Sequence, residues 1–377
     1  MSRKYDVIIV GAGIVGLAHA YQAAKNKLRV LVIERNEFAL GASVRNFGLV
    51  WPIGMKKGKM LDRALKSRKI WKKILKEQGI GYKKNGSLLL AYHPDELEVL
   101  KEFVDYAEDA PYEVEMLSRK EMKKRYAHVN PSNLKGGLMS RTEMTVDPRE
   151  AIQGVADFLA EELNVDFLFG RTVTGINLPE VTTFDQKFTA QKVIICSGTD
   201  FETLYPGQLK QAGLTKCKLQ MMRTVPIQGF ELGPTLCGGL TFRHYKAFEK
   251  CPSVKKLRKR LDKEWPEQKK YGIHVMLAQN LQGELVIGDS HKNGSEHFPF
   301  NEEVIDRAIL TYLETFYHTY GLKIAQRWEG IYPKLPNGKT ELILQPEPNV
   351  LLVNGLGGAG MTLSFGLAEE VVKEFVL

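Results

Sequence analysis

Two short runs of aliphatic residues lie near the start of the chain, with a helix-forming stretch between them. The runs cover residues 7–10 and 30–33, and each has the length of one buried strand. Residues 17–25 contain neither proline nor glycine and favour a helix. Strand, helix and strand within about 30 residues predict a β-α-β unit.

Glycines fill the turn between the first strand and the helix, and an acidic residue ends the second strand. Gly11, Gly13 and Gly16 have the spacing G-x-G-x-x-G, and Glu34 follows residues 30–33. Gly11 permits the tight turn, Gly13 lets a pyrophosphate approach the backbone, and Gly16 lets helix and strand pack closely. The helix N-terminus attracts phosphates, while a carboxylate at Glu34 binds ribose hydroxyls and repels a 2′-phosphate. The unit predicts binding of FAD or NAD rather than NADP; the alternative is a structural glycine turn in another kind of α/β protein.

Two later strands also lead into glycines. Residues 192–196 are followed by Gly198, and residues 350–353 by four glycines within 355–360. We expect both strands to join the first sheet. The second turn indicates close approach of the backbone to a flat group, and the helix after it offers a positive dipole end.

The middle of the chain has a different pattern. Short strands are predicted at 87–92, 136–139, 218–225, 229–232, 273–278 and 285–288. Helices are predicted at 61–78, 94–107, 118–125, 149–162 and 304–320, and residues 327–333 lead the chain back, with a turn at 330–333. Short strands separated by turns favour an antiparallel sheet. We therefore predict an α/β protein, α+β overall, with two interwoven domains. Residues 1–85, 145–215 and 325–377 form the nucleotide-binding domain, and 86–144 and 216–324 form a substrate-binding domain.

Composition narrows the class of protein. The chain has 377 residues, which suits two domains. It carries a net charge of +9, and basic residues crowd 56–76 and 255–263. We interpret these stretches as solvated helix faces; the alternatives are an anionic membrane or nucleic acid, or a field that steers an anionic substrate, and no nucleic-acid motif supports nucleic acid. The four cysteines have no metal-binding spacing. No apolar run is long enough to span a membrane, and the early first strand leaves no room for a signal peptide, so we expect a cytoplasmic protein.

Together these segments resemble the D-amino-acid oxidase and glycine oxidase family of FAD-dependent oxidoreductases. The markers are the first glycine turn with Glu34, residues 41–46, Thr172-Val173, Cys196-Ser197-Gly198, Gly288, residues 330–333 and the C-terminal glycine turn. Residues 45–48 running into Trp51-Pro52 are similar to a clade associated with aminoalkylphosphonate breakdown.

The resemblance implies a Rossmann-like domain that binds FAD. Relatives with covalent FAD use Cys or His, and none of the cysteines here lies in the C-terminal turn, so we expect non-covalent FAD. The residues implied to contact FAD are Gly11, Gly13, Ile14, Gly16, Glu34, Arg35, Ser43, Arg45, Asn46, Gly48, Val173, Ser197, Gly198, Gly357, Gly358, Gly360, Met361 and Thr362.

Many amino-acid oxidases of this family carry an arginine where this chain has Tyr332. That arginine grips the substrate carboxylate with two hydrogen bonds, which a tyrosine cannot do. Either the substrate is not an α-amino acid with a free carboxylate, or another basic residue binds the carboxylate in place of the arginine. Candidates for binding an anionic substrate are Arg223, Arg243, His244 and Lys334, for which surface charge is the alternative, whereas we expect His274 in the core or on the surface.

The resemblance implies oxidation of a primary or secondary amine to an imine by hydride transfer to flavin N5, followed by hydrolysis to an aldehyde or ketone. An aminoalkylphosphonate is the expected substrate, and O2 or another acceptor reoxidises the flavin. One alternative is a flavin dehydrogenase of a 2-hydroxy acid or glycerol phosphate type substrate, which passes electrons to quinone and needs a base. A non-catalytic FAD-binding subunit is the other. The oligomeric state stays open.

Overall fold

A computed structural model describes residues 4–377. Its first sheet contains five parallel strands in the order β9-β2-β1-β12-β20. The strands are β1 (Lys4–Val10), β2 (Val30–Ile33), β9 (Asp166–Leu168), β12 (Lys187–Ile195) and β20 (Val350–Asn354). The β-α-β unit and the return of the two later strands to this sheet are thus confirmed. Three antiparallel strands extend the sheet: β10 (Val173–Asn177), β11 (Glu180–Thr183) and β19 (Leu342–Glu347).

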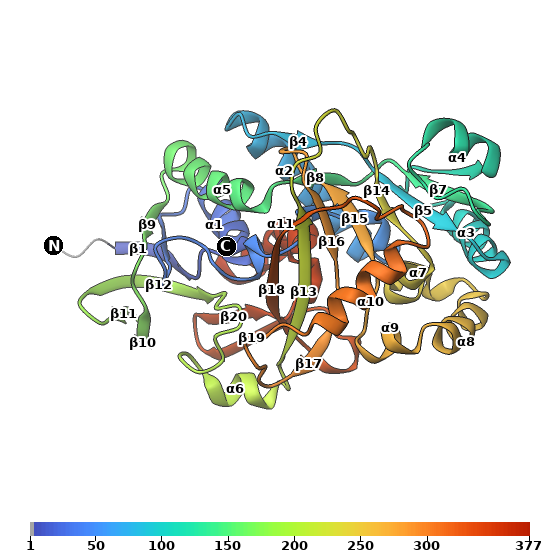
Figure 1. Cartoon of the computed structure of the whole chain (residues 1–377). Helices are drawn as coiled ribbons and strands as arrows, with labels where there is room; N and C mark the ends of the chain where they lie inside the picture. Colours follow the sequence, from blue (N-terminus) through green and yellow to red (C-terminus); the bar gives the residue numbers. More distant parts are fainter. Residues whose placement is uncertain (1–3) are drawn as a thin grey trace.

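Helices from the start, the middle and the end of the sequence cover this sheet (Figure 1). They are α1 (Ile14–Lys25), α2 (Lys59–Glu77), α5 (Pro148–Leu163) and α11 (Gly360–Val371). The ring of Phe365 meets Trp71 and Tyr21 edge-on, with centroids 5.4 and 5.6 Å apart. Because α11 packs on α1 and α2, the last glycine turn is held beside the first one.

The second sheet has nine strands in the order β17-β13-β16-β15-β14-β5-β7-β6, with β18 also pairing with β13. Their bounds are β5 (Ser87–Ala91), β6 (Val114–Ser118), β7 (Gly136–Ser140), β13 (Thr215–Thr224), β14 (Thr235–Cys237), β15 (Met276–Gln279), β16 (Leu285–Gly288), β17 (Lys292–Gly294) and β18 (Ile324–Lys334). Every pair is antiparallel except β14 with β5, so the predicted antiparallel sheet is confirmed in outline.

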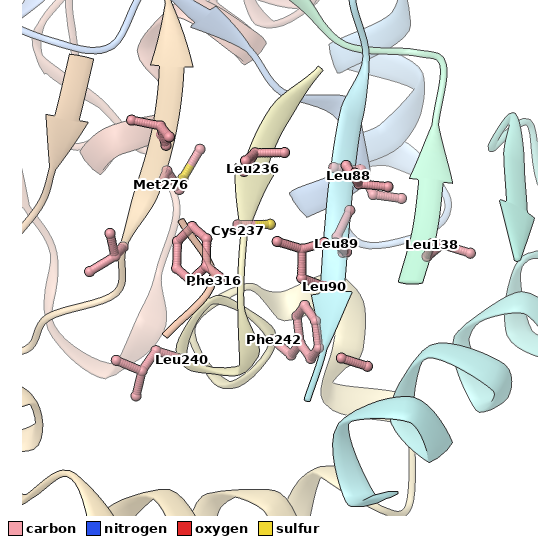
Figure 2. Close-up of a cluster of buried hydrophobic side chains, with 14 of the residues drawn as sticks. Leu88, Leu89, Leu90, Leu138, Leu236, Cys237, Leu240, Phe242, Met276 and Phe316 are labelled. Carbon is pink, nitrogen blue, oxygen red and sulfur yellow. The ribbon is translucent and has the colours of Figure 1, made fainter. Parts of the chain in front are cut away.

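A hydrophobic core lies between the nine-stranded sheet and the helices that pack on it. Leucines of β5 pack towards Leu236 and Cys237 of β14 and towards Phe242, as Figure 2 shows. The helices are α3 (Pro94–Ala107), α4 (Arg119–Arg125), α7 (Gly239–His244), α8 (Val254–Glu264), α9 (Pro266–Lys270) and α10 (Glu303–Leu313). A three-stranded sheet joins the two parts through β3 (Leu49–Val50), β4 (Tyr82–Lys83) and β8 (Met144–Val146), and α6 (Pro206–Gln211) precedes β13.

Three predictions about the middle of the chain were wrong. Residues 229–232 form a turn, because Gly229 and Gly233 adopt positive φ values, and the strand begins later, at β14. The helix predicted at 304–320 ends at Leu313, and Tyr317 instead forms a β-bridge with Val129.

The third concerns residues 327–333, which belong to strand β18 rather than to a turn. Along its length β18 pairs with β13 (Figure 1). Gly330 allows the close passage of the loop after β2, since a Cβ there would lie 2.9 Å from the Arg45 carbonyl oxygen. The division into two domains stays a prediction, but β18 lies in the second sheet although we assigned residues 325–334 to the first domain.

Candidate active site

A cavity of about 600 Å³ runs from the carboxyl ends of the parallel strands to the second sheet. Its lining begins with both glycine turns of β1 and β20 and reaches β13, β15 and β18. Ligands of open parallel sheets bind at this edge.

Glu34 organises one end of the cavity. Its Oε2 accepts a hydrogen bond of 2.9 Å from the Ala12 N–H, and its Oε1 accepts two of 3.0 Å from Asn36. Oε2 still has a free lone pair, so the carboxylate can also accept a hydrogen bond from a ribose hydroxyl. Arg35 and Val173 line the same end, and Arg35 is paired with Asp200 at 3.1 Å.

The first glycine turn and the loop after β2 form the next part of the lining. Gly13 precedes α1, and the Ile14 N–H donates to Ser43 Oγ at 2.9 Å. Asn46 fixes the loop, since its Nδ2 donates to the Ala42 and Ser43 carbonyls. The N-terminus of α1 therefore faces the cavity with a hydroxyl beside it, as binding of a pyrophosphate requires.

Two glycines that we placed near FAD serve the fold from outside the cavity lining. A Cβ on Gly16 would lie 1.9 Å from the Gly11 carbonyl oxygen, so Gly16 is the close-packing position of helix and strand. A Cβ on Gly48, whose φ is +73°, would lie 1.9 Å from the Val146 carbonyl oxygen. Gly48 therefore permits the contact with β8 and not an approach to the cofactor.

The C-terminal glycine turn forms the far end of the cavity. Asn354 Nδ2 donates to the Gly198 carbonyl at 2.9 Å, which ties this turn to the turn after β12. Gly357, Gly358, Gly360, Met361 and Thr362 all line the cavity at the start of α11. The positive end of the α11 dipole thus faces the space.

Trp51 provides a test of whether this space suits a polar cofactor. The Trp51 N–H donates to Thr362 Oγ1 at 2.9 Å. Its indole Nε1 is buried and lacks a hydrogen-bond partner among residues 4–377, although Trp51 lines the cavity. A buried donor of this kind needs an acceptor. An elongated cavity with a ribose-binding carboxylate, a helix N-terminus and a free indole donor fits a dinucleotide.

Tyr332 joins the C-terminal turn to the second sheet. It lies on β18 opposite Cys217, and its ring comes within 3.7 Å of a Cβ built on Gly357. Burial raises the pKa of Tyr332 well above its ordinary value, so the hydroxyl is neutral at physiological pH. Next to Tyr332 is His291, with ring centroids 6.4 Å apart.

Three histidines from separate elements meet beyond Tyr332; we call them the histidine cluster. His244 ends α7, His274 precedes β15, and His291 follows β16. The centroid of His244 lies 3.8 Å from that of His274 and 4.8 Å from that of His291. Ligand nitrogens of the three rings lie within 4.8 Å of one another. All three line the cavity, together with Asp289 and Tyr245.

The histidine cluster carries little charge of its own. Burial lowers the pKa of His291 to about 4 and lowers those of His244 and His274 well below the ordinary value. Burial also raises the pKa of Asp289, whose Oδ1 lies 3.2 Å from His274 Nε2. The group is therefore neutral near pH 7 while the cavity holds no anion.

The basic residues that we predicted for substrate binding fall into two groups. Arg223 is paired with Glu284 at 3.3 Å, and Arg243 with Asp262 at 2.9 Å; both lie outside the cavity lining. His244 lines the cavity, whereas Lys334 lies outside its lining but close enough for its charge to lower the pKa of His244. Salt bridges thus occupy the two arginines, and sequence alone did not show those partners.

The structure adds residues that sequence reasoning missed. His274, which we expected in the core or on the surface, is buried and lines the cavity beside His244. His291, Asp289, Tyr245 and Trp51 were not predicted as pocket residues. Residues 289–291 directly follow the buried strand β16, and this position at a strand end was the available signal.

Comparison with known proteins assigns the chain to a class. The family model described as FAD dependent oxidoreductase (DAO) matches residues 6–374. The chain therefore belongs to this family, and its cofactor is FAD. The glycine turns, Glu34 and the free indole donor of Trp51 are the local features that suit FAD.

The relatives that are similar to this chain in sequence are named for several different activities. Glycine oxidase of Bacillus licheniformis is 24% identical over 375 residues, which cover 93% of this chain and 87% of that protein. Glycerol 3-phosphate dehydrogenase of Caloramator mitchellensis is 23% identical over 318 residues, 81% of this chain. The match spans only 57% of that second protein, little more than half its length.

Solved structures show the same fold. L-proline dehydrogenase from P. horikoshii superposes with a TM-score of 0.81 at 20% identity, covering 99% of this chain and 94% of the other. Glycine oxidase from Geobacillus kaustophilus gives a TM-score of 0.78 at 19% identity, covering 100% and 95%. The helices within residues 4–377 include none that is both long and apolar enough to cross a membrane.

Proposed function

We propose that this protein oxidises a small primary or secondary amine to an imine and that its substrate is an aminoalkylphosphonate. Relatives named glycine oxidase and D-amino acid dehydrogenase support an amine or amino acid as the reducing substrate. The electron acceptor, O2 or another, and the cytoplasmic location stay predictions, and the oligomeric state stays open.

The histidine cluster is the observation that carries the choice of substrate. It lies next to Tyr332, whose ring is beside Gly357 of the C-terminal glycine turn, and Lys334 is near enough to act on it through its charge. Ring nitrogens from three separate elements gather within 4.8 Å, which favours a tetrahedral oxyanion over a planar carboxylate, for which one bidentate arginine suffices. At the position of that arginine this chain has Tyr332, which cannot make the bidentate pair.

The protein's part in the reaction is positioning. Bound FAD supplies the two-electron acceptor, which receives the hydride from the substrate carbon next to nitrogen. Tyr332 and the histidine cluster would hold the anionic end, so that this carbon faces the C-terminal glycine turn. The buried walls exclude water and favour the neutral amine, which can release the hydride. Water then hydrolyses the imine to an aldehyde and releases ammonia or a primary amine.

Oxidation of a hydroxyl group in a phosphate ester is the second candidate. Relatives named glycerol 3-phosphate dehydrogenase and oxidase support it, and so does the presence of neutral histidines that can act as a base. Both candidates share a phosphorus oxyanion and differ in the group that is oxidised.

Anaerobic reduction of the purified FAD-loaded protein distinguishes them. Its flavin absorbance near 450 nm should bleach with 2-aminoethylphosphonate or its N-methyl derivative, and more slowly with glycine, sarcosine or D-alanine. Bleaching by glycerol 3-phosphate instead selects the second candidate. If glycine or D-alanine reduces the flavin fastest, the phosphonate proposal fails. If no compound of either class reduces it, the protein is an FAD-binding subunit without this activity.

A further inference from the structure

We propose that the histidine cluster and Lys334 form a subsite for a tetrahedral oxyanion, and that the subsite takes up a proton when the anion binds. This deepens the proposed function, and it rests on that function only in taking the substrate to carry a phosphorus oxyanion. The argument starts from the hydrogen bonds that the three rings already make.

His291 has its tautomer fixed by a backbone carbonyl. Its Nδ1 lies 3.0 Å from the Gly272 carbonyl oxygen, which can only accept, so Nδ1 carries the hydrogen. In the neutral ring Nε2 is then a lone pair, which repels an anion. His291 can donate a hydrogen bond to an oxyanion only after Nε2 has gained a proton.

His274 leaves buried polar atoms without partners. Its Nδ1 has no hydrogen-bond partner within residues 4–377, and neither has Oδ1 of Asp289. His274 Nε2 lies 3.2 Å from that oxygen without the alignment of a hydrogen bond. A protein rarely buries such atoms unsatisfied, so a polar ligand with both donors and acceptors around it fits this place.

Lys334 supplies fixed positive charge. Side chains two residues apart on a strand share a face, so Lys334 points to the same side of β18 as Tyr332. Its charge lowers the pKa of both His244 and His291. Lys334 lies outside the cavity lining, so it acts on the subsite through its charge rather than through the cavity wall.

The ligand nitrogens of the three rings lie within 4.8 Å of one another, so a metal ion is the alternative occupant to a tetrahedral oxyanion. His244 and His274 are tilted by only 36° at 3.8 Å, and His274 and His291 by 25° at 5.1 Å. Stacked rings turn their faces toward one another, whereas a metal needs three nitrogen lone pairs aimed at one point about 2 Å away.

The surroundings set the direction of the pH effect. The titratable or charged groups facing the cluster are Arg243, Tyr245, Asp289, Cys217, Tyr332 and Lys334. The pKa of His291 is about 4 in the absence of an anion, and a dianion beside the ring raises it. At a pH between the pKa of His291 without the anion and its pKa with the anion, His291 gains a proton on binding. The affinity for the anion therefore falls as pH rises.

Sulfate is the probe, because it is tetrahedral and stays a dianion from pH 6 to 8. Its binding to the FAD-loaded protein is followed by the change in flavin absorbance and by calorimetry in two buffers of different ionisation enthalpy. We expect uptake of about one proton per sulfate and an affinity that falls by up to about tenfold per pH unit. Sulfate binding that takes up no proton and is independent of pH overturns the inference, as does an absence of binding at millimolar sulfate.

Variants locate the effect. His291→Asn keeps a donor for the Gly272 carbonyl and removes the titrating ring, so sulfate should bind more weakly and without dependence on pH. Lys334→Met should weaken sulfate binding about tenfold at every pH, while the dependence of sulfate affinity on pH remains that of wild type. His128→Asn, a half-buried histidine outside the cavity whose pKa is also lowered, is the matched control and should bind like wild type. A wild-type slope in His291→Asn, if that variant retains its flavin, contradicts the proposal.

Failure of this inference and failure of the proposed function are distinguishable. Sulfate binding needs no amine and no hydride transfer, whereas flavin bleaching by amines needs no proton uptake. A protein that bleaches with 2-aminoethylphosphonate but binds sulfate without proton uptake retains its proposed function and loses the inference.

Discussion

Gly16 offers a direct test of how the first glycine turn is built. In Gly16→Ala the new Cβ would lie 1.9 Å from the Gly11 carbonyl oxygen and 3.3 Å from Cγ2 of Ile9. The first contact is more than 1 Å shorter than any real Cβ contact, and a backbone oxygen cannot rotate away, so α1 must shift from β1. We expect a loss of about 3 kcal/mol in the free energy of unfolding, at the upper end for overpacking.

The same shift moves the N-terminus of α1 away from the cofactor. The variant should therefore lose FAD during gel filtration, which the ratio of flavin to protein absorbance measures, and should unfold earlier in a thermal melt followed by circular dichroism. Gly207→Ala is the control: Gly207 also lies in a helix, α6, and a Cβ there would meet nothing within 4 Å. It should be neutral or stabilise by up to about 1 kcal/mol. If Gly16→Ala retains stoichiometric FAD and unfolds within 0.5 kcal/mol of wild type, the close-packing argument is refuted.

Three further changes test other parts of the site. Glu34→Gln should weaken FAD binding at least about tenfold, because an amide cannot accept all the hydrogen bonds that the carboxylate accepts; fluorescence titration of the apoprotein measures this. Arg63, on α2, lowers the pKa of Glu370, on α11, to about 2 from its ordinary 4.5. The stability that this pair contributes is thus present above about pH 4.5 and is lost as pH falls toward 2, and Arg63→Met should flatten acid unfolding over that range. Tyr332→Arg should raise the ratio of kcat/KM for glycine over 2-aminoethylphosphonate about tenfold; an unchanged ratio would separate Tyr332 from substrate choice.

Several helices and the end of the cavity at Glu34 could be predicted from residues that are near one another in sequence. The helices predicted at 118–125 and 149–162 begin within one residue of α4 and α5, whose N-caps are Ser118, in a capping box with Glu121, and Asp147. Gly11, Gly13 and Glu34 belong to one β-α-β unit, and Glu34 accepts its hydrogen bond from Ala12 of the same unit. Such short-range features can be read without knowing the rest of the fold.

The substrate end could not be read in that way. His244, His274 and His291 come from three elements and become neighbours only through the pairing of β15 with β16 and the packing of α7. Residues 327–333 contain glycine and proline and resemble a turn, but their partner β13 lies about 110 residues earlier in sequence. Pairing over that distance is decided by tertiary structure and not by local propensity.

The tie between Asn354 and the turn at Gly198 has a consequence for how the protein matures. β1, α1 and β2 are made first, yet the edge of β12 stays open until β20 has been synthesised and has paired with it. The Gly198 carbonyl gains its partner only then, and the turn that closes the far end of the cavity forms only after that. The nucleotide site is therefore complete only when residues 350–362 have packed against β12 and the turn at Gly198. Damage to residues 350–362 should yield a protein that releases its flavin.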